Sequence, residues 1–368
     1  MIEATIPEVS VVMAVYNGEK YLKPTIETVL TQTLKDFEFI IVNDASTDST
    51  LNIISLYNDP RIIIHNNNVN MGQTASLNTG LRISRGKYIA RTDAGDISMP
   101  DRFRKQIRFL DEHPEIDILG TAAFQYDVAG NFCGNVFMPN RPSTILQRIF
   151  FACPVIHISV MMRRERILQL SGYNESYRIL ADYGLWAKAL QNGFRFWNLG
   201  EVLAGYLVTP DSFGYSHGRG RSVQEAAHII CDVSQNMTGI HLSLDQAEDL
   251  YRFFVFGPQD IDNKRILKTE ALFEALLLKL NVPRRDIDYL LLKSCLKMIF
   301  RRSYEPSSQK HKLKDVLRSI LSKWRGGWSF HLFEDINRYI QTLRYIHFST
   351  VGAKVPRFIH EVADKQQE

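Results

Sequence analysis

The sequence predicts an α/β fold with a mostly parallel sheet, helices on both of its faces and a helical C-terminal region. Three observations predict it. From Val9 to Ala123, short apolar β-rich runs alternate with segments whose apolar residues follow helical spacing. Such alternation is typical of parallel strands joined by crossover helices, and the early runs end in small or polar residues, as strands do at turns. From about Ala226 only helical spacing remains.

The first expected strand is Val9–Val15, which breaks at Tyr16-Asn17-Gly18 before a helix over Tyr21–Leu30. The alternation then continues with strands over Phe37–Val42, Arg61–His65, Tyr88–Ala90 and Ile118–Ala123, and with helices over Leu51–Tyr57, Thr74–Ser84 and Asp101–His113. A hairpin or loop is expected over Ala122–Pro142, where Gly130 and Gly134 serve as turn points, and a further helix over Ala181–Gln191.

The composition is that of an ordinary globular protein. The 368 residues are 45% hydrophobic and 23% charged, which suits two domains. The formal net charge of +4 is too small to indicate nucleic acid as a partner, and no nucleic-acid motif occurs. No secretory signal or membrane-spanning run is apparent. The cysteines form no CxxC pair, so reduced thiols in the cytoplasm are expected rather than zinc or disulfides: Cys133, Cys153, Cys231 and Cys295.

Polar residues follow the first, second and fourth expected strands at the point where each strand ends. They are Tyr16-Asn17, Asn43-Asp44, and Asp93 with Asp96. Because parallel strands bring their carboxyl ends to one edge of a sheet, these groups are expected to converge there, where open α/β sheets bind ligands. No GxGxxG follows the first strand and no GxxxxGK[ST] occurs, which argues against NAD-type and P-loop sites.

Asp93 and Asp96 close the short strand of KYIARTDAGDISMP and have two interpretations. Two adjacent carboxylates repel each other, so a divalent cation that prefers oxygen ligands, Mg²⁺ or Mn²⁺, is a natural partner, often shared with a phosphate. Taken alone, the pair is better explained as an Asx turn that caps the next helix, for which Ser98, Pro100 and Asp101 supply start signals.

Asp182 also has two interpretations. It lies in the first turn of the helix over Ala181–Gln191, on the same face as Leu185 and Trp186. An acid in a first turn can simply cap the helix or complement its dipole. The functional alternative is a general base at the floor of a cleft.

Six segments, in this order along the chain, resemble the family 2 glycosyltransferases, which are inverting enzymes of the Rossmann-like GT-A fold that use nucleotide-sugar donors. The segments span about Val9 to Ser212 and are VSVVMAVYNGEKYL, FIIVNDASTDST, NMGQTASLNTGL, GKYIARTDAGDISMPDRFRKQ, PVIHISVMMRRE and ADYGLW.

The resemblance implies a donor site whose residues come from several strand ends and one loop. Tyr16 is expected to stack on the base, and Asp44 to accept a hydrogen bond from it. Asn43 replaces the first acid of the usual pair, and Leu77 stands where many members carry Arg. The full set implied for donor binding is Ala14, Tyr16, Asn17, Asp44, Gly72, Asn78 and Asp93.

The resemblance also implies a metal site and a catalytic base. Asp96 matches a direct ligand of Mg²⁺ or Mn²⁺, with Asp93 as a ribose contact or a partner in the metal site, and Asp182 matches the general base. Three positions depart from the family pattern: Gly95 and Ala181 replace acids, and Thr209 replaces a histidine.

The implied function is an inverting transfer of a sugar from a nucleoside diphosphate sugar, a UDP-sugar as first guess, to a hydroxyl of a glycan or lipid-linked saccharide. The departures at Gly95, Ala181 and Thr209 leave open a catalytically silent binding or scaffold subunit of the same fold. A nucleotidyltransferase is disfavoured because no Gly-rich phosphate loop follows the first strand.

Two domains are expected, with residues 1–225 catalytic and residues 226–368 helical. Residues 284–330 hold twelve Lys or Arg against four Asp or Glu, beside Trp324 and Trp328. Basic helices of this kind can lie on an anionic membrane surface, although a solvated helical face explains the pattern slightly better. The expected location is therefore cytoplasmic, with peripheral contact at the inner face of the membrane as a hypothesis.

Overall fold

A computed structural model describes residues 6–140, 142–209, 219–256 and 263–281. The chain forms two compact units. The first runs to Ile145 and resumes over residues 153–219, whereas the second takes the short segment 146–152 and continues from Gly220. A piece from the middle of the chain therefore belongs to the C-terminal helical unit.

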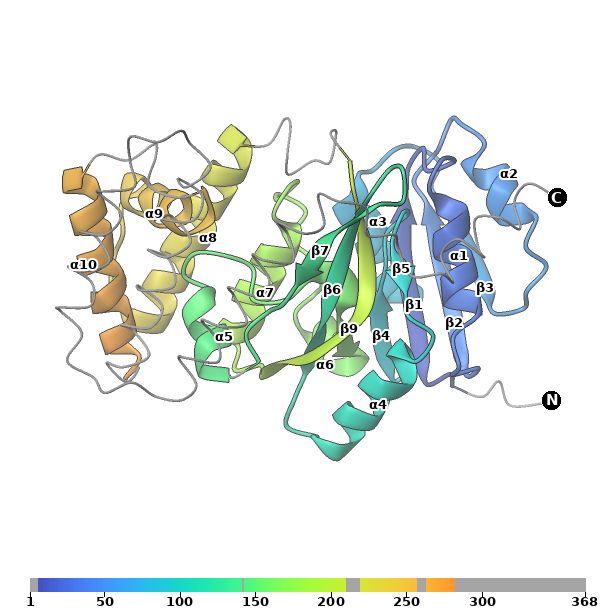
Figure 1. Cartoon of the computed structure of the whole chain (residues 1–368), viewed down its shortest axis with the longest axis horizontal. Helices are drawn as coiled ribbons and strands as arrows, with labels where there is room; N and C mark the ends of the chain where they lie inside the picture. Colours follow the sequence, from blue (N-terminus) through green and yellow to red (C-terminus); the bar gives the residue numbers. More distant parts are fainter. Residues whose placement is uncertain (1–5, 141, 210–218, 257–262, 282–368) are drawn as a thin grey trace. The chain divides into compact units, whose positions relative to one another are not determined.

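The first unit is built on one nine-stranded sheet with the order β3-β2-β1-β4-β8-β6-β9-β5, and β7 pairs with β6 (Figure 1). β1 to β4 pair in parallel, as predicted. β8 runs antiparallel to both β4 and β6, so the whole sheet is mixed. The strands are β1 Val9–Val15, β2 Phe37–Asn43, β3 Ile62–Asn66, β4 Tyr88–Arg91, β5 Ile97–Ser98, β6 Ile118–Asp127, β7 Phe132–Val136, β8 Met161–Arg163 and β9 Phe196–Val208.

Helices cover both faces of the sheet, as the side chains of β1 show. Val11 and Met13 join a core cluster with α1 and α4. Val12 points to the opposite face, where its Cγ1 lies so near Gly80 of α3 that a Cβ there would approach it to 2.5 Å. The helices of this unit are α1 Leu22–Leu30, α2 Thr50–Ser55, α3 Gln73–Ile83, α4 Arg102–Glu112, α6 Arg164–Gln169 and α7 Ala181–Gln191, with a 3₁₀ turn, η1, at His157–Ser159. Helix α5, Pro142–Arg148, begins in this unit and ends in the second.

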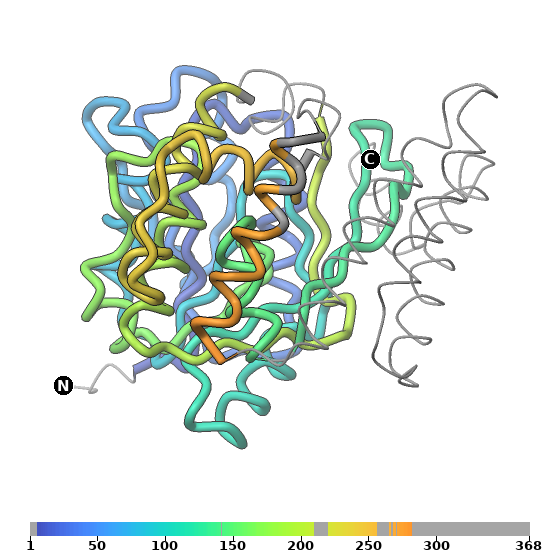
Figure 2. Tube along the Cα trace, turned by 90° about the vertical axis from the view of Figure 1, so that its left-hand side faces the viewer, coloured from blue at the N-terminus to red at the C-terminus, as the bar shows by residue number. Residues whose placement is uncertain are grey.

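The second unit is helical, as predicted, and its core is aromatic. Phe151 stacks on Phe254, with ring centroids 4.2 Å apart, and meets Phe273 edge-on at 5.5 Å. These contacts explain why segment 146–152 belongs to this unit. Its elements are α8 Arg219–Thr238, α9 Leu244–Tyr251, a π-helical turn η2 at Arg252–Phe256 and α10 Asn263–Lys279, of which α9 and α10 lie side by side (Figure 2).

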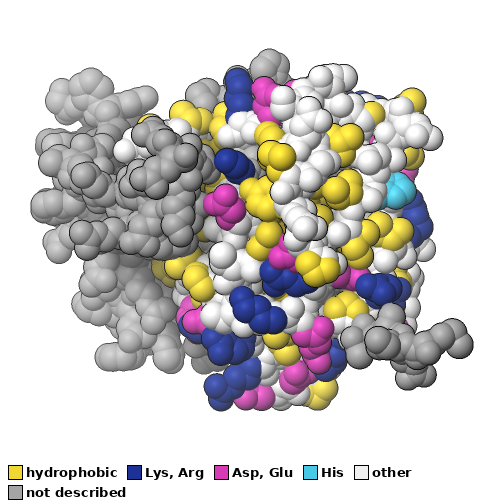
Figure 3. Space-filling model, turned by 90° about the vertical axis from the view of Figure 1, so that its right-hand side faces the viewer, with side chains coloured by type: hydrophobic (Ala, Val, Ile, Leu, Met, Phe, Trp, Pro, Cys, Tyr) yellow, Lys and Arg dark blue, Asp and Glu magenta, His cyan; other side chains and the backbone are white. Residues whose placement is uncertain are grey.

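Several expectations fall beyond the described part of the chain. They concern the helical spacing beyond residue 281 and the basic segment 284–330. Among the described residues, no helix is both long enough and apolar enough to span a bilayer. Acidic and basic side chains are interspersed on the face in Figure 3, in keeping with the small net charge.

Candidate active site

A pocket of about 320 Å³ opens at the carboxyl ends of β1, β2 and β4. We call it the edge pocket. Five of the seven residues expected to bind a donor line it, namely Ala14, Tyr16, Asn17, Asp44 and Asp93. Its other lining residues are Val15, Gly18, Tyr21, Gln73 and Ala94. The parallel register of β1 with β2 and β4 brings these distant residues together.

The turn after β1 holds Tyr16 at the pocket. Asn17 adopts a left-handed conformation, with φ of 50°, and its Oδ1 accepts a hydrogen bond from the Thr47 N–H at 2.8 Å. The Gly18 N–H donates to Thr50 Oγ1 at 2.8 Å, and a Cβ at Gly18 would approach Val15 Cγ2 to 2.5 Å. The turn is thus fixed to the loop after β2, while the Tyr16 residue remains 51% exposed. Its ring is available to a flat ligand.

Asp44 is a buried carboxylate that organises the loop before α3. Its Oδ1 accepts hydrogen bonds from Asn67 Nδ2 at 2.7 Å and from the Met71 N–H at 2.8 Å, and its Oδ2 accepts one from the Gly72 N–H at 2.8 Å. Burial acts to raise the pKa of Asp44, but these hydrogen bonds lower it below the ordinary value. Gly72 has φ of 88° and does not line the pocket. Its N–H helps to hold the Asp44 carboxylate, which does line the pocket.

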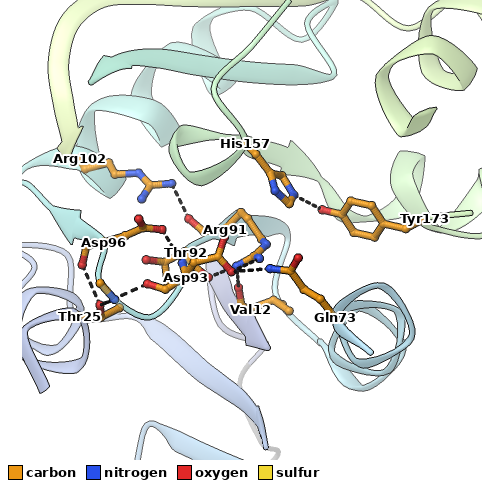
Figure 4. A network of polar contacts seen from close by, with 11 residues as sticks. Val12, Thr25, Gln73, Arg91, Thr92, Asp93, Asp96, Arg102, His157 and Tyr173 are labelled. Carbon is orange, nitrogen blue, oxygen red and sulfur yellow. Dashed lines mark hydrogen bonds and ion pairs between the residues drawn. The ribbon is translucent and has the colours of Figure 1, made fainter. Parts of the chain in front are cut away.

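Asp93 lies in the pocket wall, and Asp96 does not line the pocket. Figure 4 shows Asp96 on the side of the turn that faces Thr25. Asp93 Oδ1 accepts hydrogen bonds from the Arg91 guanidinium and from Gln73 Nε2. Asp96 is 5% exposed, and its Oδ2 accepts from the Asp93 N–H at 2.6 Å. Burial, reinforced by the charge of Asp93, raises the pKa of Asp96. The expected Asx turn that caps the next helix is not formed, because Asp96 accepts from an N–H three residues earlier and the N-cap of α4, Asp101, makes no side-chain capping bond. Asp93 rather than Asp96 lies at the surface of the pocket.

Two buried arginines offset the negative charge of Asp93 and Asp96. Arg91 and Arg102 are each 1% exposed. Arg102 donates to Ser98 Oγ at 3.0 Å and to the carbonyl oxygens of Arg91 and Val160 at 3.0 and 3.2 Å, and burial lowers its pKa to about 9. Their positive charge allows two carboxylates to lie together in a site that is largely closed to water.

The acidic pair fits a cation only in partnership with a ligand. Within the described residues, no cluster of three His, Cys, Asp or Glu side chains could hold a metal ion. Mg²⁺, however, is commonly bound by one or two carboxylates together with substrate phosphates and water. Asp93 meets that lesser requirement at the pocket surface, and Asp96 lies in the same turn without lining the pocket.

Asp182 lies in the first turn of α7 and not at its N-cap, which is Leu180. Its Oδ1 accepts from the Tyr183 N–H at 2.8 Å, and its Oδ2 accepts from the Cys153 thiol at 3.4 Å. A carboxylate at this end of a helix is stabilised by the helix dipole, whether or not it also has a catalytic role. Asp182 does not line the edge pocket.

His157 connects Asp182 electrostatically with the pocket acids. Its Nε2 lies 2.8 Å from the Tyr173 hydroxyl (Figure 4). Burial and the Arg91 guanidinium lower the pKa of His157 to about 4, although the carboxylates of Asp182 and Asp93 both act to raise it. Both carboxylates are therefore close enough to influence the same imidazole.

Asn78 is not brought to the pocket. It is 6% exposed; its Nδ2 donates to the Tyr173 carbonyl at 2.9 Å and to Glu175 Oε1 at 3.0 Å, and its Oδ1 accepts from the Tyr173 N–H at 2.8 Å. Its amide therefore fixes the 173–175 loop rather than contacting a ligand of the edge pocket. Arg91, which holds the Asp93 carboxylate, was not predicted as a site residue, and the one available signal was a charged residue inside the buried strand β4.

Comparisons with known proteins identify similar chains. The family description "Glycosyl transferase family 2" matches residues 10–169. EpsE of Bacillus subtilis, which is named as a glycosyltransferase, is 37% identical over 211 residues, covering 56% of this chain and 74% of EpsE. WfaP of Escherichia coli, named as a UDP-Glc:alpha-D-GlcNAc-diphosphoundecaprenol beta-1,3-glucosyltransferase, is 30% identical over 200 residues, covering 54% of this chain and 77% of WfaP.

Solved structures show the same fold. TarS of S. aureus, residues 1–349 in complex with UDP-GlcNAc, superposes with a TM-score of 0.53 at 18% identity, covering 88% of this chain and 93% of that one. The match in fold agrees with the mixed sheet and its flanking helices. On the strength of the relatives at 30% identity and above, the chain belongs to glycosyl transferase family 2.

Proposed function

We propose that this glycosyltransferase is an inverting enzyme that moves a sugar from a UDP-sugar to a hydroxyl of a glycan or lipid-linked saccharide. The observation that carries the proposal is the edge pocket, in which Ala14, Tyr16, Asn17, Asp44 and Asp93 meet although they are far apart in the sequence. An aromatic ring and two carboxylates suit a base, a ribose and a diphosphate with its cation.

Relatives guide the choice of donor and acceptor. The name of WfaP specifies UDP-Glc and a diphosphoundecaprenol-linked sugar, and TarS was solved with UDP-GlcNAc. A uridine donor and a lipid-linked acceptor are therefore the substrates we propose to test first. Peripheral membrane contact through the basic residues 284–330 would bring the enzyme to such an acceptor. Co-sedimentation with anionic liposomes, measured for the full chain and for a chain that lacks this segment, tests the membrane contact.

The proposed mechanism is a single displacement at the anomeric carbon. Asp182 accepts the proton of the acceptor hydroxyl as the new glycosidic bond forms, and the nucleoside diphosphate leaves from the opposite face of the sugar. Asp93 at the pocket wall, with Asp96 in the same turn, would hold a divalent cation, Mg²⁺ or Mn²⁺, which when bound would supply positive charge for the leaving diphosphate. The Arg91 guanidinium donates to Asp93 Oδ1 and so orients the carboxylate at the pocket wall.

Thermal unfolding with a panel of nucleoside diphosphates, each with and without Mn²⁺, tests the donor assignment. A bound ligand stabilises the native state by mass action, so UDP with Mn²⁺ is expected to give the largest rise in melting temperature. An equal response to every nucleotide would contradict a uridine site. UDP binding without any turnover of UDP-sugars would support a silent subunit of the same fold.

Tyr16→Ala is expected to weaken UDP binding by about tenfold, because stacking of a base on an aromatic ring contributes about 1–3 kcal/mol. The half-exposed Tyr16 supports no core, so little change in stability is expected. Titration calorimetry with UDP measures the effect. Tyr16→Phe, which keeps the ring, is the control and should bind normally; a similar loss in both variants would argue against stacking.

A further inference from the structure

The start of α3 contacts the edge pocket. Gln73, the first residue of this helix, lines the pocket, and its Nε2 donates a hydrogen bond to Asp93 Oδ1 at 3.1 Å (Figure 4). The preceding Gly72 donates its N–H to Asp44 Oδ2 at 2.8 Å. The two carboxylates that line the pocket, Asp44 and Asp93, are therefore both held from the start of α3.

The same helix holds the part of the chain that leads to α7. Further along α3, Asn78 Oδ1 accepts from the Tyr173 N–H at 2.8 Å, and Asn78 Nδ2 donates to the Tyr173 carbonyl oxygen at 2.9 Å and to Glu175 Oε1 at 3.0 Å. Gly172 has φ of 72°, and a Cβ there would approach Asn78 Oδ1 to 2.4 Å. Asn78 therefore fixes the start of the loop over residues 173–177 to α3.

Thr74 fixes the end of this loop. Its Oγ1 donates to the Tyr177 carbonyl oxygen at 3.1 Å. The Tyr177 ring lies against the first turn of α7, since a Cβ on Gly184 would approach Tyr177 Cδ2 to 2.7 Å and Cε2 to 2.8 Å. A glycine leaves room for the ring on the backbone of the helix. The same turn of α7 carries Asp182.

We propose that Thr74 is a positioning residue for the transfer step: through Tyr177 it fixes the first turn of α7, and with it Asp182, relative to a donor in the edge pocket. The inference rests on the proposed roles of Asp182 and of the edge pocket, and it adds the helix that joins them. Gln73 and Thr74 are neighbours, so one turn of α3 determines where Asp93 receives the donor and where the acceptor hydroxyl loses its proton. A displacement of about 1 Å in such a geometry can lower a rate about 10²-fold.

Thr74→Val tests the proposal because it removes one hydroxyl and keeps the branched shape of the side chain. The matched control is Thr79→Val. Thr74 and Thr79 lie in the same helix and are each 8% exposed, but Thr79 Oγ1 donates to the Ala75 carbonyl oxygen within α3.

Two quantities are measured on each full-length variant in MnCl₂. One is the single-turnover rate at saturating UDP-Glc or UDP-GlcNAc, with water as the acceptor, and the other is the affinity for UDP by calorimetric titration. Thr74→Val is expected to lower the rate about tenfold and to leave UDP affinity unchanged, because the donor contacts of Gln73 and Asp93 remain. Thr79→Val should match the wild type in both.

Three further variants separate positioning from general destabilisation. Thr74→Ser keeps the hydroxyl and should keep the rate. Gly184→Ala displaces the Tyr177 ring without altering α3 and should lower the rate, although alanine favours a helix more than glycine does. In the Asp182→Asn background, Thr74→Val should cause little further loss, because groups that act as a unit are not additive.

The inference and the proposed reaction fail in different ways. A wild-type rate in Thr74→Val or in Gly184→Ala, an equal loss in Thr79→Val, or a further tenfold loss in the Asp182→Asn background would overturn the positioning role and leave the proposed reaction intact. Full activity of Asp182→Asn would overturn the assigned base and with it the role of Thr74.

Discussion

Asp182→Asn is expected to lower turnover by about 10²- to 10⁴-fold, the usual contribution of a general base, while UDP-sugar affinity stays unchanged. The amide can still accept the hydrogen bond from the Tyr183 N–H, so the first turn of α7 should remain folded. It cannot, however, take a proton from the acceptor. Single-turnover kinetics with saturating donor, together with calorimetric titration of the donor, separate the two quantities.

Asp245→Asn is the matched control for this variant. Asp245 is likewise an acid in the first turn of a helix, α9, in the other unit of the chain. If Asp182 only complements a helix dipole, both substitutions should cost a few tenths of a kcal/mol to about 1 kcal/mol of stability and neither should affect turnover. Full activity of Asp182→Asn would remove the base assignment.

Asp93→Asn is expected to weaken UDP binding in MnCl₂ by about tenfold or more and to make the remaining binding insensitive to EDTA. The amide preserves the shape of the side chain and an acceptor for Arg91 and Gln73, but it removes the charge that would attract a cation at the pocket wall. Calorimetric titrations of UDP in Mn²⁺ and in EDTA, carried out on the wild type and on the variant, measure how strongly UDP binding depends on the cation.

The control for this experiment is Asp111→Asn, which removes another ion-paired acid, bonded to Lys87 and Tyr88 and remote from the pocket lining. It should leave both UDP affinity and the EDTA effect at wild-type values. A variant Asp93→Asn that still loses UDP on addition of EDTA would show that the cation is held elsewhere.

Local patterns were sufficient to predict the first half of the sheet. β1 and β2 are buried along their whole length, so each appears in the sequence as a continuous apolar run, and α1 and α4 each place apolar residues in the core at helical spacing. β5 and β8 were not predicted, because two or three residues are too few to show alternation. β8 also pairs antiparallel with β4 and β6, and that placement depends on strands far away in the chain.

The site residues that could be predicted from the sequence are those whose positions are determined by the ends of the parallel strands. Tyr16, Asp44 and Asp93 converge because parallel strands share an edge, and nothing beyond the alternation was needed. Asn78 shows the limit of such inference: its amide is occupied by the backbone of Tyr173, 95 residues further along the chain. The burial of Asp96 in the turn after Asp93 is likewise a property of the folded turn, fixed by Thr25 from α1.

The helical unit could be predicted in its secondary structure but not in its full extent along the chain. Helical spacing predicted its character, but no local pattern indicated that residues 146–152 belong to it. Phe151 joins Phe254 and Phe273 through ring contacts across more than a hundred residues, and an apolar run has no feature that identifies its packing partner in advance.

The stereochemistry of donor hydrolysis tests the central claim, a single displacement assisted by Asp182, most directly. Proton NMR, recorded in real time on an α-linked UDP-sugar with the wild-type enzyme and water as the acceptor, identifies the anomer released before mutarotation. We predict that the β-anomer appears first and that Asp182→Asn suppresses its release. Initial release of the α-anomer would contradict an inverting mechanism.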